Sequence, residues 1–382
     1  MSASSKYIAW QNQGQGHPYQ LYYNRIGDTA QTLANKYSPI LIMHHDEVFS
    51  PKPVEFALNM PLTTICRWDP VSNSIDPDFF INANSLSLQA NSSSNMFINF
   101  PGNAEDTATY FGYDQFKFLN RYVAPYLNNA GNYPDAVYSH IVTSEDGSQT
   151  AIEYWFFYYV NNYFDFHEGD WENVNVILEP GADKNLVPTK CANLVHDSGI
   201  WREWNQVEGS GSHPLIYVAN GSHESYFDAP PGLPLTGTWT GLHLVNWKGF
   251  SLPIADYTDP NGRMVPLHDV RVLPDAPLSD SDDSFGWLAF AGNWGEINKS
   301  DWAGNNSMIR TGEDRSGPPG PPFQGTWRDP FTWQQNLPCD GCQDDSGTQT
   351  GLEVTKHSPV DIRVYDSQGR VMAKRVIVKS CV

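Results

Sequence analysis

A group of ionisable residues follows an aromatic stretch near the middle of the chain. The run from Tyr154 to Val160 leads to Asp165, His167, Asp170 and Glu172. Asp170 and Glu172 are two residues apart, so on an extended segment both carboxylates point to the same face. Two carboxylates on one face repel each other unless a cation or a proton lies between them. The spacing therefore indicates a site for one or the other.

The side chains in this group favour a hard divalent cation. Three carboxylates and one imidazole suit calcium, magnesium or manganese, whereas a zinc site would usually show more histidine or cysteine. The predicted metal ligands are His167, Asp170, Glu172 and Asp165. A carboxylate that caps a turn, next to a carboxylate on the surface, would give the same pattern without any metal.

Two further predicted strands also end in histidine and carboxylate. Strand ends in one sheet can converge on a single cleft. We therefore expect the polar residues after 40–43 and 214–219 to border a common site, although each alone could be an exposed strand end. These residues are His44, His45, Asp46, Glu47, His223 and Glu224.

The same residues also fit an enzyme. Two carboxylates can act as general acid and general base on a sugar or an ester, with one pKa raised by its neighbour. In that case Asp170, Glu172 and His223 would be catalytic. A serine nucleophile is disfavoured, because Ser222 and His223 are adjacent and diverge on an extended segment, and no Gly-x-Ser-x-Gly elbow occurs.

Composition limits the classes of partner. The 382 residues include 23 Lys and Arg against 43 Asp and Glu, a formal net charge of −20, which repels nucleic-acid backbones. We find no apolar run long enough to span a membrane and no secretory signal, so we expect a soluble protein, cytoplasmic by default or exported by a non-standard route. Five scattered cysteines argue against a disulfide framework. Nothing indicates an oligomeric state.

The pattern of elements predicts a mainly β fold with a β-sandwich-like core, short helices and long loops. Buried strands are expected at 40–43, 191–196 and 214–219, and helices at 28–36, capped by Asp28, and after Ser50. Residues 60–135 read as loops and short strands. We expect a main domain over 1–340 and a small β appendage over 341–382, beyond a linker rich in Gly, Asp and Ser.

Several motifs, taken in order, resemble the vacuolar protein sorting-associated protein 62 family. They are the segments 39–54, Gly169-Asp-Trp-Glu172, 213–226, Asn293-Trp-Gly295 and Gly317-Pro-Pro-Gly320, and together they extend over roughly residues 35–335. The resemblance implies a β-rich fold. The family name also suggests a third function, that of a trafficking adaptor.

The central stretch is similar to a motif of the necrosis-inducing NPP-type cytolysins. His167, Asp170, Trp171 and Glu172 match the Gly-His-Arg-His-Asp-Trp-Glu heptapeptide of those β-sandwich proteins, and Gly169 stands where the motif has its second histidine. The resemblance implies that His167, Asp170 and Glu172 hold a divalent cation. It also implies a glycan, a glycolipid or a membrane surface as the partner. The alternative function, a metal-dependent or two-carboxylate hydrolase, rests on the residues themselves.

Overall fold

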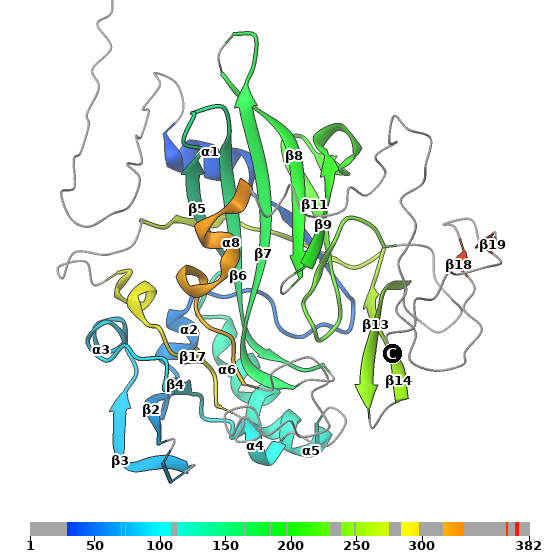
Figure 1. The fold of residues 1–382 in the computed structure, drawn as a ribbon. Helices are drawn as coiled ribbons and strands as arrows, with labels where there is room; N and C mark the ends of the chain where they lie inside the picture. Colours follow the sequence, from blue (N-terminus) through cyan, green and yellow to red (C-terminus); the bar gives the residue numbers. More distant parts are fainter. Residues whose placement is uncertain are drawn as a thin grey trace, which may run out of the picture.

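The computed structural model is rich in β-strands (Figure 1). It describes residues 29–69, 71–72, 74–107, 113–163, 166–183, 185–195, 198–229, 238–247, 250–274, 284–297, 316–331, 364–365 and 371–373. The predicted domain boundary at residue 340 lies outside these ranges. Within the predicted appendage, β18 (Val364–Tyr365) and β19 (Val371–Ala373) form an antiparallel pair.

A six-stranded sheet forms the centre of the molecule, in the order β16-β5-β6-β7-β8-β9. Strands β5 to β9 follow one another as an antiparallel meander, and β16 joins β5 in parallel. Every residue of β6 is buried, because both faces of the sheet are covered. The six strands are β5 (Ala136–Thr143), β6 (Thr150–Asn161), β7 (His167–Pro180), β8 (Leu186–Val195), β9 (Ser198–Glu203) and β16 (Asp269–Val272).

A smaller sheet packs on one face of the central sheet. In it, β1 runs parallel to β11, with Ile40 opposite Leu215, and antiparallel to β15. Apolar side chains of β1, β11 and β15 share one core with side chains of β6 and β7, so the two sheets form a sandwich. The strands are β1 (Ile40–Met43), β10 (Gly209–Ser210), β11 (His213–Val218), β12 (Ser225–Tyr226) and β15 (Arg263–Pro266).

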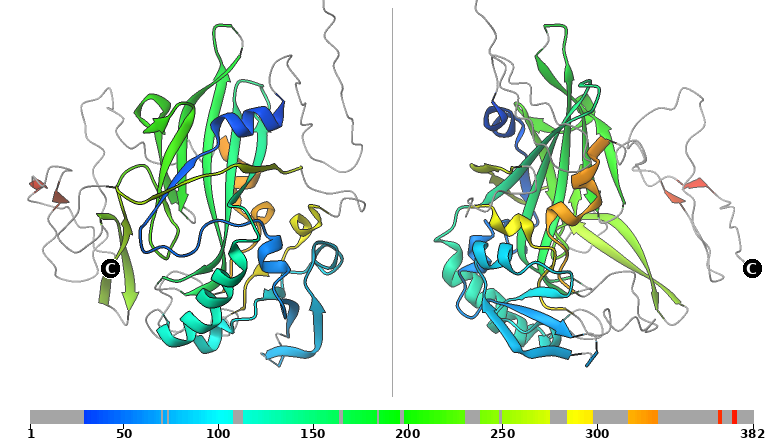
Figure 2. Two further views of the ribbon diagram at one scale, coloured as in Figure 1. Left: turned by 180° about the vertical axis from the view of Figure 1, so that it is seen from behind. Right: turned by 60° about the vertical axis from the view of Figure 1, so that its left-hand side comes forward.

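Short helices cover the opposite face of the central sheet. Phe56, Phe118 and Tyr126 from these helices share a second core with Phe157 and Trp171 of β6 and β7. Figure 2 shows α8 and α1 on opposite sides of the central strands. The covering elements are α2 (Glu55–Leu58), α5 (Gln115–Phe118), the π-helical turn η1 (Leu119–Val123), α6 (Ala124–Ala130), the 3-10 turns η3 (Gly286–Ala289) and η4 (Pro321–Phe323), and α8 (Gly325–Arg328).

The remaining elements lie around this three-layer core. A third sheet has the order β17-β4-β2-β3. None of the described helices has the length and apolarity needed to cross a bilayer. These elements are α1 (Ala30–Tyr37), β2 (Thr64–Asp69), β3 (Ser74–Asn82), α3 (Ser85–Ala90), β4 (Met96–Asn99), α4 (Ala104–Thr107), η2 (Trp204–Gln206), the hairpin β13 (Thr238–Trp247) and β14 (Phe250–Thr258), and β17 (Asn293–Trp294).

The mainly β fold class is confirmed, but some local predictions are wrong. The first helix is capped by Thr29, whose side chain accepts the Thr32 N–H, and not by Asp28. Ser50 does not cap a helix, because its Oγ bonds to Asp135 and its N–H to Tyr126, and α2 starts four residues later than expected. Residues 60–135 contain four short helices and a π-helical turn besides the expected strands.

Gly169 lets the residues on either side of it in β7, Glu168 and Asp170, face different layers. In a regular strand Glu168 and Asp170, two residues apart, would share a face. Glu168 instead accepts a hydrogen bond of 2.7 Å from Tyr122 in the helical layer, whereas Asp170 pairs at 2.8 Å with His223 of the small sheet's loops. The φ of 62° at Gly169 reverses the alternation. A Cβ there would lie 1.9 Å from the carbonyl oxygen of Trp294.

We predict that Gly169→Ala destabilises the protein by at least about 3 kcal/mol, because a left-handed φ strains alanine and the backbone of Trp294 cannot move away cheaply. Gly211→Ala is the matched control, since Gly211 has a φ of 67° and open space around its Cβ position. It should cost only about 1–2 kcal/mol. Urea unfolding followed by tryptophan fluorescence measures both, and equal losses would contradict the proposed clash.

Candidate functional site

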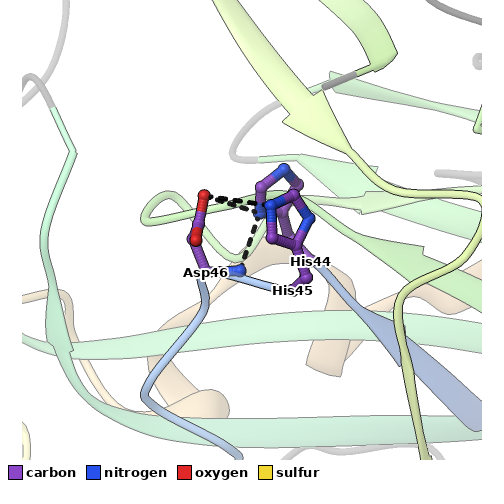
Figure 3. Close-up of side chains that lie close together, drawn as sticks. All are labelled: His44, His45 and Asp46. Atoms are coloured by element: carbon purple, nitrogen blue, oxygen red, sulfur yellow. Dashed lines mark hydrogen bonds and ion pairs between the residues drawn. The ribbon is translucent and has the colours of Figure 1, made fainter. Parts of the chain in front are cut away.

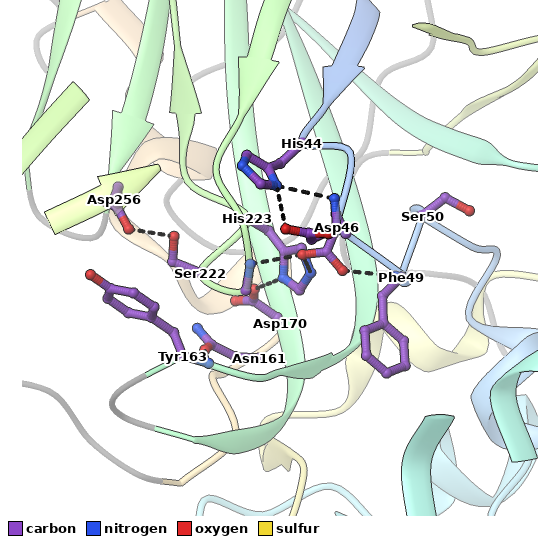
Figure 4. A network of polar contacts seen from close by, with 12 residues as sticks. His44, Asp46, Phe49, Ser50, Asn161, Tyr163, Asp170, Ser222, His223 and Asp256 are labelled. Atoms are coloured by element: carbon purple, nitrogen blue, oxygen red, sulfur yellow. Dashed lines mark hydrogen bonds and ion pairs between the residues drawn. The ribbon is translucent and has the colours of Figure 1, made fainter. Parts of the chain in front are cut away.

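The loops that follow β1 and β11 leave the small sheet at the same end of its strands. The two strands are parallel neighbours, so their C-terminal ends coincide. The loop after β1 carries His44 to Glu47, and the loop after β11 carries Gly221 to Glu224. Asp170 of β7, in the central sheet, contacts His223 at this end of the small sheet (Figure 4). Three segments far apart in the sequence therefore meet at one end of the sandwich.

Glu47 joins the two loops of the small sheet. Its carboxylate accepts the N–H of Phe49 in its own loop and the N–H of Gly221 in the other, each at 2.7 Å. Burial alone raises the pKa of Glu47, but the charge of His223 and these two hydrogen bonds outweigh it and leave the pKa below its usual value. Glu47 is therefore an ionised carboxylate in the interior.

His223 lies between two buried carboxylates. Its Nδ1 is 2.8 Å from Oδ2 of Asp170, and its Nε2 is 3.5 Å from Oε2 of Glu47. The ring stacks on Tyr158 with 4.0 Å between centroids, and the side chain is fully buried. His223 also has a φ of 57°, a conformation that non-glycine residues adopt at some cost and that surrounding contacts must maintain.

The two carboxylates keep this imidazole charged. Burial lowers the pKa of His223, but the charge of Glu47 and the hydrogen bond to Asp170 outweigh burial and raise it to about 9. At neutral pH His223 is therefore an imidazolium that donates its Nδ1–H to Asp170. The three groups form a buried acid–base–acid cluster with a net charge of −1.

Glu172 adds negative charge beside the cluster. Asp170 and Glu172 lie on one face of β7, both buried, and Asp170 is the cross-strand neighbour of Tyr158. Burial, followed by the charges of Glu172 and Asp170, raises the pKa of the Tyr158 hydroxyl well above its usual value. That hydroxyl has no hydrogen-bond partner among the described residues. The negative charges of Asp170 and Glu172 are therefore both close to the Tyr158 hydroxyl.

Two residues of this region were not identified from the sequence. Asp256, near the end of β14, accepts hydrogen bonds from Ser222 at 2.7 Å and Tyr226 at 2.6 Å, and Tyr226 also bonds to Glu224. Ser222 thus bonds to Asp256 and not to His223, in line with the weak prediction for a serine nucleophile. The sequence around Asp256 has no neighbouring histidine to draw attention to it, and Tyr158 reads simply as part of an apolar strand.

The predicted metal ligands are only partly brought together. His167 is buried at the start of β7 and donates its Nδ1–H to the carbonyl oxygen of Gly169 at 2.8 Å. Asp165 lies outside the described residues. Across the described ranges, His167, Asp170 and Glu172 do not form a group whose ligand atoms all lie within 4.8 Å of one another. The prediction of a metal at these residues remains untested.

The residues after β1 divide between the interior and the surface. His44 and Glu47 are buried, whereas His45 and Asp46 are 49% and 68% exposed. Burial and the neighbouring charge of His45 lower the pKa of His44. The predicted strand end at 44–47 is thus real, but only Glu47 belongs to the cluster around His223.

Comparisons with known proteins give a limited similarity. No protein-family model and no curated protein matches the chain, so the resemblance to the vacuolar protein sorting-associated protein 62 family has no support. Among solved structures, NLPPya in complex with mannosamine matches at 18% identity and a TM-score of 0.28, covering 56% of this chain and 72% of that one. The non-toxic HaNLP3 protein matches at 12% identity and a TM-score of 0.28, covering 67% and 79%.

A third structure of the same kind is similar to the chain. It is Necrosis and Ethylene inducing Protein 2 from the causal agent of cocoa's Witches Broom disease, at 14% identity and a TM-score of 0.27, covering 52% of this chain and 69% of that one. Each of these matches covers only part of either chain.

We predict that His223 stays protonated up to about pH 9 in metal-free protein. Because its folded pKa lies above the usual value near 6.5, the stabilisation is complete below about pH 6.5 and is lost as the pH rises through about 9. Nitrogen-15 NMR of the histidine rings should show an imidazolium at pH 7.5, with a lower pKa in Glu47→Gln. A neutral His223 ring at pH 7.5 would contradict the cluster described above.

Proposed function

We propose that the protein binds a divalent cation at the end of the sandwich where β7 meets the loops of the small sheet, and that the cation holds a glycan or glycolipid head group. Asp170 and Glu172 would supply carboxylate ligands and His167 an imidazole. Calcium, magnesium and manganese suit such an oxygen-rich set. The observation that carries this proposal is the pair of buried carboxylates on one face of β7.

The energetics of burial support a cation at this pair. Asp170 and Glu172 are 5% and 6% exposed, and removing two carboxylates from water costs several kcal/mol per group unless positive charge compensates. The imidazolium of His223 compensates one charge but is shared with Glu47. A bound divalent cation would place further positive charge beside both carboxylates.

The hydrogen bonds around the ligands also support a metal. Ligating carboxylates and histidines are usually oriented by second hydrogen bonds from the protein. His223 holds Oδ2 of Asp170, which leaves Oδ1 for an ion. The carbonyl oxygen of Gly169 can only accept, so this hydrogen bond places the proton of His167 on Nδ1, and a metal would have to bind through the other ring nitrogen, Nε2. Ion binding would have to draw the three side chains closer together.

The burial of His223 favours binding over catalysis. A general acid or base must come within hydrogen-bonding reach of its substrate. His223 is fully buried, and both carboxylates next to it are also buried. In this arrangement the imidazolium of His223 orients the carboxylate of Asp170, as residues behind a metal ligand do in binding proteins.

We predict that chelator-stripped protein binds at least one of calcium, magnesium and manganese, and that Asp170→Asn and Glu172→Gln each weaken that binding at least about tenfold, because a carboxylate ligand is lost. Isothermal titration calorimetry measures the affinity. Asp78→Asn removes an exposed carboxylate of β3 and serves as the matched control. The absence of heat with all three ions, together with no shift of the melting temperature, would overturn the metal site.

We also predict that sugar binding depends on the cation. Glucosamine is the first probe, tested with and without the ion that calorimetry identifies. Binding should vanish after chelation and in Asp170→Asn, because the cation would contact the sugar directly. If the ion binds but neither glucosamine nor a wider glycan array is retained, the metal site stands and the glycan partner is wrong.

A further inference from the structure

We propose that His44, His45 and Asp46 form a second metal site, which takes zinc or a similar borderline transition metal. The three residues follow β1 directly and lie close together in one turn (Figure 3). One ligand atom from each can be chosen so that all lie within 4.8 Å of one another. The site uses none of the ligands proposed above and does not depend on that function.

Asp259 sets the state of the His45 ring. Its Oδ2 lies 2.7 Å from Nδ1 of His45, and a carboxylate can only accept, so Nδ1 carries a proton. In the neutral ring Nε2 then presents a lone pair. A histidine whose second nitrogen donates to a carboxylate is a recurrent arrangement among metal ligands. His45 is therefore prepared to bind a metal through Nε2.

The lone pair of His45 points at another acceptor. Its Nε2 is 3.3 Å from Oδ2 of Asp46. A lone pair and a carboxylate at this distance repel each other unless a proton or a metal ion lies between them. In a tetrahedral zinc site with bonds of about 2.0–2.1 Å, neighbouring ligand atoms are about 3.3 Å apart. The observed separation therefore fits two ligands of one zinc ion.

His44 completes the set from the buried side. Its Nδ1 accepts the N–H of Asp46 at 3.1 Å and lies 4.0 Å from the Asp46 carboxylate, so its lone pair already points into the turn. The ring stacks on His45 with 4.3 Å between centroids. A metal would replace the weak backbone hydrogen bond, and one of the two stacked rings would have to turn so that both lone pairs meet at the ion.

Asp259 holds one side of the His44–Asp46 turn, and the other side is open to solvent. Asp259 is held in place, because its second carboxylate oxygen accepts the N–H of Asn261 at 2.8 Å. The turn that contains Asp259 lies next to the end of β1, because Met43 of β1 pairs with Arg263 of β15. His45 and Asp46 are about half or more exposed. Three protein ligands with a position open to solvent are typical of zinc sites that bind water or a substrate.

Ligand chemistry separates this site from the one on β7. Two imidazoles and one carboxylate favour zinc, cobalt, nickel or copper over calcium and magnesium, which prefer oxygen. Asp170 and Glu172 offer carboxylates only, with a single imidazole from His167. The two sites should therefore respond to different metals and to different substitutions.

The test is a titration of full-length, chelator-stripped protein with cobalt, followed by visible absorption, and with zinc, followed by calorimetry. We expect His45→Ala to abolish the tetrahedral cobalt band and to weaken zinc binding at least about tenfold. His268→Ala, which removes another exposed histidine, should leave both unchanged. Asp259→Asn should weaken zinc binding about 10–100-fold, as expected when a supporting carboxylate is lost.

Asp170→Asn distinguishes this proposal from the previous one. It should leave the cobalt band intact, even if it removes calcium or magnesium binding. The second site is overturned if His45→Ala binds zinc as the unaltered protein does, or if Asp170→Asn removes the cobalt band together with the response to calcium.

Discussion

The attraction between one buried imidazolium and two buried carboxylates holds the site end of the sandwich together. Glu47, His223 and Asp170 come from three different segments, and their contacts join the loops of the small sheet to β7 of the central sheet. Removing one partner of such a cluster leaves an uncompensated charge in the interior, which typically costs about 3–5 kcal/mol. The backbone N–H groups of Phe49 and Gly221 complete the solvation that water would otherwise provide.

The aromatic strand β6 packs against the small sheet on one face and against the helices on the other. Tyr154, Phe156 and Tyr158 face the small sheet, whereas Phe157 and Tyr159 face the helices. The same division continues on β7 through the reversal at Gly169. There Glu168 accepts hydrogen bonds from Tyr122, Phe100 and Glu296 on the helical side, and burial together with the charge of Glu296 raises its pKa to about 8. Glu168 and Asp170, on either side of Gly169, thus serve different parts of the molecule: Glu168 stabilises the helical layer, and Asp170 belongs to the candidate site.

The turn after β1 contributes to two sites of different character. Glu47 points inward and is held by backbone hydrogen bonds and by His223, whereas His45 and Asp46 face solvent and contact Asp259, His44 and each other. Buried carboxylates around Tyr158 suit a hard cation, and the pair of imidazoles, one buried and one half exposed, suits a softer one. Because the two proposed sets share no ligand, a metal at one would not require a metal at the other.

Local patterns in the sequence determined the strands and the residue types at their ends. The run Ile40–Met43 is a buried strand as expected, and the same-face spacing of Asp170 and Glu172 holds because both lie beyond Gly169. Only the tertiary structure decided which groups meet. His223 and Asp170 are 53 residues apart, and their contact depends on the parallel pairing of β1 with β11 and on the packing of two sheets. Asp256 and Asp259 also contact the site residues across long sequence separations, through the hydrogen bonds to Ser222 and to His45. A local pattern shows how a strand presents its side chains, but contacts between distant segments depend on the free energy of packing the whole chain.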